Sequence, residues 1–220
     1  MAVYIIYSSK YFEALNHLKY LALGDSYTIG ESVDYDLNFP SQTTALLRRS
    51  GFSIDDPTII AQTGWTTDEL MNAITSANTP SRFDVVSLLI GVNNQYRAYP
   101  IDKYKQEFES LLKTAILFAG GQHSCVFVLS IPDWGVTPYA AGRDKNKISA
   151  EIDAYNAINR SIAENYKVRY IDITPETRNA SSNIFLLASD GLHPSAIAYT
   201  EWAIKLSQEI MPVLLQRQKG

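Results

Sequence analysis

The order of apolar and amphipathic segments in this chain predicts an α/β fold, in which helices cover both faces of a parallel β-sheet. Five short apolar segments of strand type alternate with longer segments that carry apolar residues at helical spacing. Strands that are apolar throughout are typical of a sheet buried on both faces, joined by right-handed helical crossovers. With 220 residues, of which 46% are hydrophobic and 19% charged, the chain is long enough for one domain with a full core.

The predicted strands are short and apolar, and glycine or polar residues follow them and end them. In chain order they are Tyr20–Leu23, Thr58–Ala61, Asp84–Ile90, Cys125–Ile131 and Val168–Ile173. The third and fourth, DVVSLLI and CVFVLSI, are almost entirely apolar, as expected of strands that contact helices on both faces.

The predicted helices carry apolar residues three or four positions apart, and several have recognisable ends. They are Pro40–Ser50, Thr66–Ala77, Asp102–Phe118, Ser149–Tyr166 and Ser195–Leu215. Gly51 ends the first helix. Thr66 or Thr67 can cap the second, where the side chains of Asp68 and Glu69 complement the helix dipole.

No linker, internal repeat or low-complexity stretch divides the chain, so we expect a single domain over residues 19–220. Residues 1–18 precede the first predicted strand and form an N-terminal extension to which the sequence assigns no structure. The long loop Pro132–Lys147 contains Trp134 and Tyr139 together with two glycines. A loop of this length after a central strand is more often functional than structural.

Charge and composition argue against several classes of partner and cofactor. A formal net charge of −4 and the absence of a dense basic run argue against nucleic acid. No apolar run approaches the roughly 20 residues of a membrane span, and the N-terminus lacks a basic region and a cleavage site, which favours a cytoplasmic location. The single cysteine, Cys125, rules out an internal disulfide and a cysteine-based zinc cluster, and its apolar surroundings predict a buried, unreactive thiol.

The residues that follow the predicted strands are candidate site residues, because ligands of an open parallel sheet bind outside the carboxyl ends of its strands. These segments are Gly24-Asp25-Ser26, Gln62-Thr63-Gly64-Trp65, Gly91-Val92-Asn93-Asn94, Pro132-Asp133-Trp134 and Asp190-Gly191-Leu192-His193-Pro194. One edge of the sheet therefore collects a serine, two glycine-containing turns, two amides, a tryptophan and an Asp-x-x-His sequence.

A nucleophilic serine needs a base within about 3 Å to take its proton, and the base needs an acid that fixes its tautomer. Of three histidines, His17 and His123 precede strands and are expected at the amino edge of the sheet. Only His193 is placed to meet Ser26. Asp190 lies three residues before His193 and can act as the acid from the same turn.

An acyl-transfer site also needs hydrogen-bond donors for the oxyanion of its tetrahedral intermediate. Candidate donors are the backbone N–H groups of Ser26 and Gly64 and the side-chain amide of Asn93. Each signal alone has a structural alternative: Ser26 as a helix cap, Gly64 and Asn93 as turn residues, and Asp190 with His193 as a pair before a helix. Their common place after strand ends favours the catalytic interpretation.

The segments GDSYTIG, QTGWTTDEL, GVNNQ and DGLHPS together resemble the four blocks of the SGNH (GDSL-type) hydrolase family. The resemblance runs from about Tyr20 to the last helix. It implies a nucleophile at Ser26, oxyanion donors at Ser26, Gly64 and Asn93, an acid at Asp190 and a base at His193. It also implies a flavodoxin-like three-layer α/β/α sandwich with a five-stranded parallel sheet in the order 2-1-3-4-5.

Two features qualify the resemblance. The third block of the family usually reads Gly-x-Asn-Asp, whereas here Asn94 replaces the carboxylate. The α/β-hydrolase elbow Gly-x-Ser-x-Gly is absent around Ser26, because Thr28 stands where its second glycine would be. The second feature favours the flavodoxin-like fold over the α/β-hydrolase fold.

These observations predict a serine esterase that forms an acyl-enzyme at Ser26, prefers short or medium acyl groups and needs no metal or cofactor. Its substrate is a small-molecule ester, and Tyr27, Trp65, Trp134 and Tyr139 are expected at the pocket entrance, where they could contact an acyl group or stack on a sugar. Within the family, a lysophospholipase, a thioesterase or a carbohydrate acetylesterase is the alternative. Outside it, the alternatives are a non-catalytic flavodoxin-like module that binds a small anion and a degraded family member used for interaction.

Overall fold

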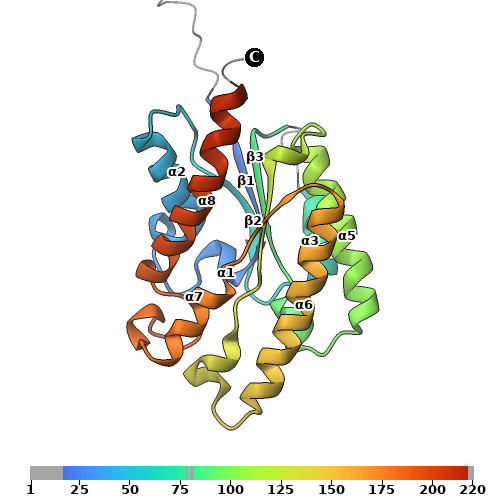
Figure 1. Cartoon of the computed structure of the whole chain (residues 1–220), viewed down its shortest axis with the longest axis vertical. Helices are drawn as coiled ribbons and strands as arrows, with labels where there is room; N and C mark the ends of the chain where they lie inside the picture. The colour runs from blue at the N-terminus through green and yellow to red at the C-terminus, as the bar shows by residue number, and fades with distance from the viewer. Residues whose placement is uncertain (1–16, 78, 80–81, 218–220) are drawn as a thin grey trace, which may run out of the picture.

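The computed structural model describes residues 17–77, 79 and 82–217 and contains one parallel sheet (Figure 1). Its strand order is β2-β1-β3-β4-β5, which confirms the predicted order. The strands are β1 (Tyr20–Asp25), β2 (Thr58–Gln62), β3 (Val85–Leu89), β4 (Val126–Leu129) and β5 (Arg169–Ile171).

The three inner strands are buried along their whole length, whereas the two edge strands are not. Every residue of β1, β3 and β4 is buried, and Leu23 of β1 pairs with Ile60 on one side and Leu88 on the other. Residues of β2 and β5 are mostly half-buried or exposed. The expectation that all five strands are covered on both faces is therefore wrong for β2 and β5, because each has only one neighbouring strand.

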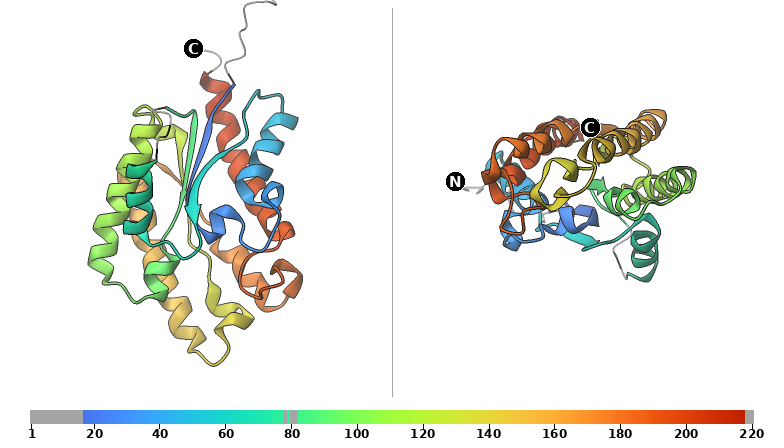
Figure 2. Two further views of the ribbon diagram at one scale, coloured as in Figure 1. Left: turned by 180° about the vertical axis from the view of Figure 1, so that it is seen from behind. Right: turned by 90° about the horizontal axis from the view of Figure 1, so that it is seen from below.

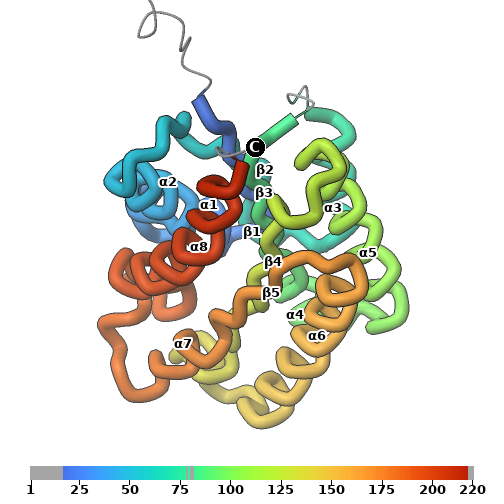
Figure 3. Tube along the Cα trace, turned by 45° about the horizontal axis from the view of Figure 1, so that its top comes forward, coloured from blue at the N-terminus to red at the C-terminus, as the bar shows by residue number. Residues whose placement is uncertain are grey.

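The longer helices form two layers that enclose the sheet (Figures 2 and 3). α2 (Phe39–Arg49) and α8 (Ala196–Arg217) pack together on one face, while α3 (Thr67–Ser76), α5 (Ile101–Phe118) and α6 (Lys145–Asn165) cover the other. The short helices are α1 (Ser26–Ile29), α4 (Val92–Tyr96) and α7 (Thr174–Arg178). The three-layer α/β/α sandwich is confirmed.

The segment between β4 and α6 is shorter and more ordered than the predicted loop. It contains two 3₁₀ turns, Trp134–Val136 and Pro138–Ala140, and α6 begins at Lys145, four residues earlier than predicted. Asp144 caps α6 by accepting the backbone N–H of Lys147 at 3.0 Å. The sequence hid this start because the first turn carries lysines rather than apolar residues.

The carboxyl ends of the strands meet at the lower end of the molecule in Figure 1, opposite the chain's C-terminus. α1, α7 and the two 3₁₀ turns lie at this edge. His17 and His123 lie before β1 and β4 and bind Asp55 and the carbonyl of Tyr166, so they stay at the amino edge.

Two further predictions concern single features of the chain. Cys125 is 1% exposed, in agreement with its apolar sequence context. Of the predicted N-terminal extension, residues 1–16 lie outside the described part of the chain, and Leu18 pairs with Ile54 next to the sheet. None of the described helices combines the length and the apolar character that a membrane crossing requires.

Candidate active site

Ser26 lies where β1 ends and the single turn of α1 begins. Asp25 is the N-cap of α1 and accepts the backbone N–H of Tyr27 at 3.0 Å. Gly30 ends the turn in the left-handed region, with φ +76°, which glycine adopts without strain. The tight strand–turn connection leaves Ser26 only 4% exposed but keeps it in the lining of a pocket at the carboxyl edge.

Ser26, His193 and Asp190 form a continuous hydrogen-bonded chain. His193 Nε2 lies 2.9 Å from Ser26 Oγ, and His193 Nδ1 lies 2.7 Å from Asp190 Oδ2. Because an ionised carboxylate only accepts hydrogen bonds, Nδ1 carries the proton and Nε2 is left to accept from the serine hydroxyl. The three residues thus have the geometry of a nucleophile, a base and an orienting acid.

The turn before α8 fixes the acid and the base together. Asp190 Oδ1 accepts the backbone N–H groups of Leu192 at 2.9 Å and His193 at 3.0 Å, and Oδ2 accepts the hydroxyl of Ser32 at 2.7 Å. Partial burial opposes ionisation, but these hydrogen bonds and that from His193 outweigh it and lower the pKa of Asp190 to about 2. The acid is therefore charged at neutral pH. Ser32 had no sequence signal, since it meets Asp190 only in the folded chain.

Gly64 and Asn93 line the same pocket as Ser26. Gly64 has φ +85°, a conformation that side chains disfavour. Asn93 Nδ2 donates to the carbonyl of Trp65 at 3.0 Å and lies 3.5 Å from Asp25 Oδ2. The carbonyl of Trp65 fixes the orientation of the amide and engages one of its two hydrogens.

Arg97 and Glu69, which the sequence did not single out, hold the loop that carries Gly64. Arg97 Nη2 donates to the carbonyl of Gly64 at 2.6 Å, and Nη1 pairs with Glu69 Oε1 at 3.1 Å. Glu69 Oε2 in turn accepts the backbone N–H of Thr66, the N-cap of α3. The loop is therefore tied to α3 on one side and to the end of α4 on the other.

The carboxyl of Asp25, to which the sequence analysis assigned no role of its own, also belongs to the site. It is 0% exposed, and burial raises its pKa to about 7, although the Tyr27 backbone N–H that it accepts acts in the opposite direction. A group with this pKa changes its charge near neutral pH, directly beside Ser26 and 3.5 Å from Asn93.

Asn94 ties α4 to the start of α3. Its side-chain oxygen accepts the backbone N–H of Thr67 at 3.1 Å, and its Nδ2 donates to Thr67 Oγ1 at 2.7 Å. The Thr67 hydroxyl then donates to Glu107 of α5. A carboxylate at position 94 could not donate to the hydroxyl, so the amide makes a bond that the usual aspartate cannot.

Three of the four predicted aromatic residues line the pocket, namely Tyr27, Trp134 and Tyr139. Trp65 corrects the prediction: its ring packs against the hydrophobic core, and it is not among the described residues that line the pocket. Burying a large ring against the core is favourable, and the residue contributes only its carbonyl near the site. Tyr96, which the sequence did not single out, lines the pocket beside Tyr139.

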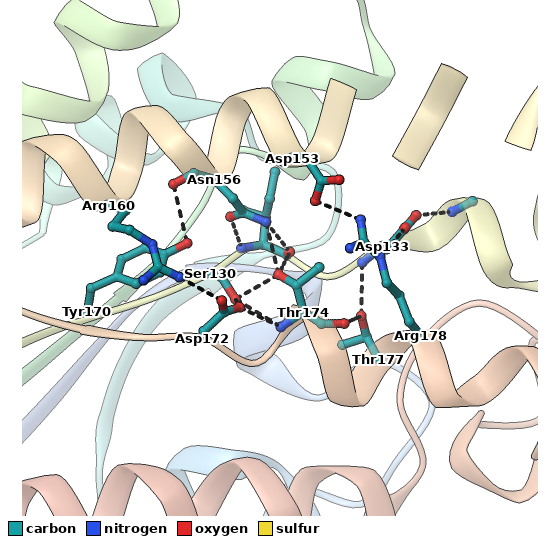
Figure 4. A network of polar contacts seen from close by, with 12 residues as sticks. Ser130, Asp133, Asp153, Asn156, Arg160, Tyr170, Asp172, Thr174, Thr177 and Arg178 are labelled. Carbon is teal, nitrogen blue, oxygen red and sulfur yellow. Dashed lines mark hydrogen bonds and ion pairs between the residues drawn. The ribbon is translucent and has the colours of Figure 1, made fainter. Parts of the chain in front are cut away.

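A polar network anchors the segment that carries Trp134 (Figure 4). The buried carboxylate of Asp133 accepts the Gly135 backbone N–H at 2.9 Å and Arg178 Nε at 2.9 Å. The backbone N–H of Asp133 donates to Thr177 Oγ1 at 3.1 Å. Trp134 is thereby held on one side of the pocket by groups from α7.

Comparison with solved structures finds the same fold in an acetylxylan esterase and in other proteins. Acetylxylan esterase Axe2 of Geobacillus stearothermophilus matches with a TM-score of 0.67 and 21% identity over 88% of this chain and 94% of that chain. TesA matches with a TM-score of 0.64 and 17% identity over 88% and 98% of the two chains. A putative lipolytic protein of the G-D-S-L family from Desulfitobacterium hafniense matches with a TM-score of 0.62 and 14% identity over 88% and 99%. No curated protein sequence matches the chain.

The fold and the Ser26–His193–Asp190 geometry are those of an α/β/α hydrolase. A family model described as GDSL-like Lipase/Acylhydrolase matches residues 22–200, and the chain belongs to this family. It is accordingly a carboxylic ester hydrolase.

Proposed function

We propose that the protein hydrolyses carboxylic esters by a double displacement at Ser26. His193 takes the proton of Ser26 as Oγ attacks the ester carbonyl carbon, and Asp190 stabilises the imidazolium that results. The backbone N–H groups of Ser26 and Gly64 and the amide of Asn93 stabilise the oxyanion. The observation that carries the proposal is the unbroken chain of 2.9 Å and 2.7 Å contacts from Ser26 Oγ through His193 to Asp190.

The remaining steps of the reaction use the same groups. His193 gives its proton to the leaving alcohol as the acyl C–O bond breaks, which leaves an acyl-enzyme. Water then attacks the acyl carbon with His193 again as the base, and Ser26 recovers its proton as the acid product leaves. Asp190 stays ionised throughout the cycle and can stabilise the imidazolium of His193 each time it forms, because hydrogen bonds lower the pKa of its carboxyl to about 2.

We also propose that the preferred acyl group is short or medium. The pocket that contains Ser26 has a volume of about 170 Å³ and is lined by the rings of Tyr27, Tyr96 and Tyr139. Such a pocket suits a small acyl group with an aromatic or sugar alcohol beside it. The likeness in fold to an acetylxylan esterase makes a carbohydrate acetyl ester a second candidate substrate.

Two variants test the reaction. Ser26→Ala removes the nucleophile and is expected to lower kcat/KM for p-nitrophenyl acetate by at least about a thousandfold, while its unfolding transition stays close to that of the wild type. Ser110→Ala, which removes an exposed serine hydroxyl that donates to the carbonyl of Gln106 within α5, is the matched control and should retain activity. Unchanged hydrolysis by Ser26→Ala would contradict the proposal.

A substrate series tests the acyl preference. We expect kcat/KM to fall as p-nitrophenyl esters lengthen from acetate to octanoate and decanoate. The rate of acetate release from acetylated xylo-oligosaccharide serves as the comparison. A maximum at the long-chain esters would contradict the short or medium preference. A far higher rate on the acetylated sugar would favour the carbohydrate acetylesterase.

A further inference from the structure

Arg143 lies against two of the aromatic rings that line the pocket, those of Tyr96 and Trp134. Its guanidinium carbon is 4.9 Å from the ring centroid of Tyr96 and 5.2 Å from that of Trp134. Its Nη2 donates to the hydroxyl of Tyr96 at 3.0 Å, and that hydroxyl lies 3.3 Å from the hydroxyl of Tyr139. We call Tyr96, Trp134 and Tyr139 the aromatic shelf. Stacking on ring faces and a hydrogen bond to the shelf hold the guanidinium in place.

Within the described part of the chain, Arg143 differs from Arg97, the other arginine that contacts residues of the pocket, because its charge is not neutralised by an ion pair. Arg97 pairs with Glu69, whereas Arg143 makes no ion pair with any carboxylate of the described residues. Asp144, its neighbour in sequence, is engaged in capping α6. The side chain is exposed, so its positive charge is presented to solvent at the rim of the pocket.

Glu151, an acid linked to Trp134 of the shelf through Gln95, is also engaged. Glu151 accepts the side-chain N–H of Gln95 at 2.7 Å and lies 3.8 Å from Lys147. Gln95 in turn accepts the indole N–H of Trp134. Nη2 is the only guanidinium nitrogen of Arg143 that is hydrogen-bonded among the described residues, and it uses one of its two hydrogens, so the other Nη2 hydrogen remains beside the N–H of Nη1 or Nε for an anion.

The shelf adjoins the turn that carries His193. The backbone N–H of Tyr139 donates to the carbonyl of Gly191 at 3.3 Å, and a Cβ placed on Gly191 would contact Pro138 at 3.6 Å. Under the proposed function, His193 protonates the leaving alcohol. The alcohol portion of the ester therefore lies on the side of the pocket where the shelf and Arg143 stand.

We propose that Arg143 and the aromatic shelf form a subsite for a carboxylate on the alcohol portion of the ester, so that preferred substrates are acyl esters of hydroxy acids. This inference rests on the proposed function. A guanidinium offers paired N–H donors that match the two oxygens of a carboxylate, and the rings provide a surface for the carbon skeleton between carboxylate and ester. In the reaction, the acyl C–O bond breaks, the alcohol oxygen takes its proton from His193, and the carboxylate leaves unchanged.

The test uses a charged and a neutral aryl acetate with the same ring skeleton, namely 4-acetoxybenzoate and its methyl ester, and follows the release of acetate from each. The measured quantity is the ratio of kcat/KM for the charged ester to kcat/KM for the neutral ester. This ratio is compared between each variant and the wild type, so the different intrinsic reactivities of the two phenols cancel. In Arg143→Gln the ratio is expected to fall about five- to tenfold, with Arg143→Lys in between, because an exposed charged pair contributes modestly.

Arg49→Gln is the matched control. Arg49 is an exposed arginine at the last turn of α2, which runs antiparallel to the strands and ends at the amino edge, and its loss should leave the ratio unchanged. A third substrate, the mono-4-nitrophenyl ester of glutaric acid, carries its carboxylate on the acyl portion. Arg143→Gln should reduce kcat/KM for this ester less than for 4-acetoxybenzoate.

Three outcomes would overturn the inference. An unchanged ratio in Arg143→Gln would show that Arg143 does not recognise the carboxylate, even if both rates fall. An equal fall in the Arg49 variant would indicate general electrostatic attraction, and an equal loss on the glutarate ester would contradict the assignment to the alcohol side. Failure of the proposed function is distinct, because Ser26→Ala would then still hydrolyse the neutral methyl ester.

Discussion

Replacing Asp25 by asparagine should change how the stability of the protein depends on pH. Burial raises the pKa of Asp25 from its ordinary value of 3.8 to about 7. Between these values the folded protein keeps the proton and the unfolded chain has released it. Rising pH therefore favours unfolding: the contribution of Asp25 to stability is fully present below pH 3.8 and is lost as pH rises through 7.

The size of the effect follows from the width of the pH window. Between pH 5 and pH 7 the difference between the folded and unfolded states falls from nearly one proton to about half a proton at this site, which corresponds to about 2 kcal/mol of free energy of unfolding, and to about 3 kcal/mol by pH 8. Asparagine carries no charge at any pH, and its side-chain oxygen can still accept the Tyr27 N–H that caps α1. Asp25→Asn should therefore gain about 3 kcal/mol relative to the wild type between pH 5 and pH 8.

Chemical denaturation measures this directly. Unfolding by urea at pH 5 and pH 8, followed by the fluorescence of the three tryptophans, gives the free energy of unfolding of each protein at each pH. Asp102→Asn, which removes an exposed carboxyl from the first turn of α5, is the matched control and should follow the wild type. If the difference between Asp25→Asn and the wild type is the same at both pH values, the reasoning about the buried carboxyl is refuted.

Three further substitutions test parts of the site. Arg97→Ala should lower kcat about tenfold or more, with little change in KM, because it releases the carbonyl of Gly64. Partial recovery of kcat by Arg97→Lys in steady-state kinetics would separate a positioning role from a loss of folding. An unchanged kcat in Arg97→Ala would contradict the positioning role of Arg97. Asp190→Asn should lower kcat by about a thousandfold or more at constant protein stability, since it removes the charge that orients His193. A loss of less than tenfold in the same assay would contradict the role of Asp190 as the orienting acid. Asn94→Asp should lower the midpoint of thermal unfolding by removing a buried donor worth about 1 kcal/mol, and a raised midpoint would show that the amide is not needed.

Much of the fold could be predicted because the inner strands are buried on both faces and are therefore apolar throughout. Thr66, with an acid three residues later, predicted the start of α3 within one residue. The start of α6 could not be predicted in the same way, because its cap, Asp144, precedes a turn of lysines. The sequence also did not indicate that β2 is only partly buried, because the position of a strand at the edge of a sheet depends on pairing between distant segments.

Some residues of the candidate site could likewise be predicted from the sequence, and others could not. Ser26, Gly64 and Asn93 each follow a strand end, and His193 lies between the last strand and the last helix, so the rule that ligands bind at the carboxyl edge was enough to select them. Arg97 and Ser32 act on residues 33 and 158 positions away, and their sequence neighbourhood contains nothing that indicates the contact. The misplacement of Trp65 has a related cause, because the direction of a side chain after a strand end depends on the local turn.

The most direct test of the central claim is covalent labelling of Ser26. A fluorophosphonate should add one equivalent to the wild-type protein, with the modified peptide mapping to Ser26, because the reagent needs an activated serine beside oxyanion donors. His193→Ala should slow the labelling by at least about a hundredfold, and Ser26→Ala should abolish it. No labelling of the folded wild-type protein, or labelling that persists in Ser26→Ala, would contradict the account of Ser26 as the nucleophile.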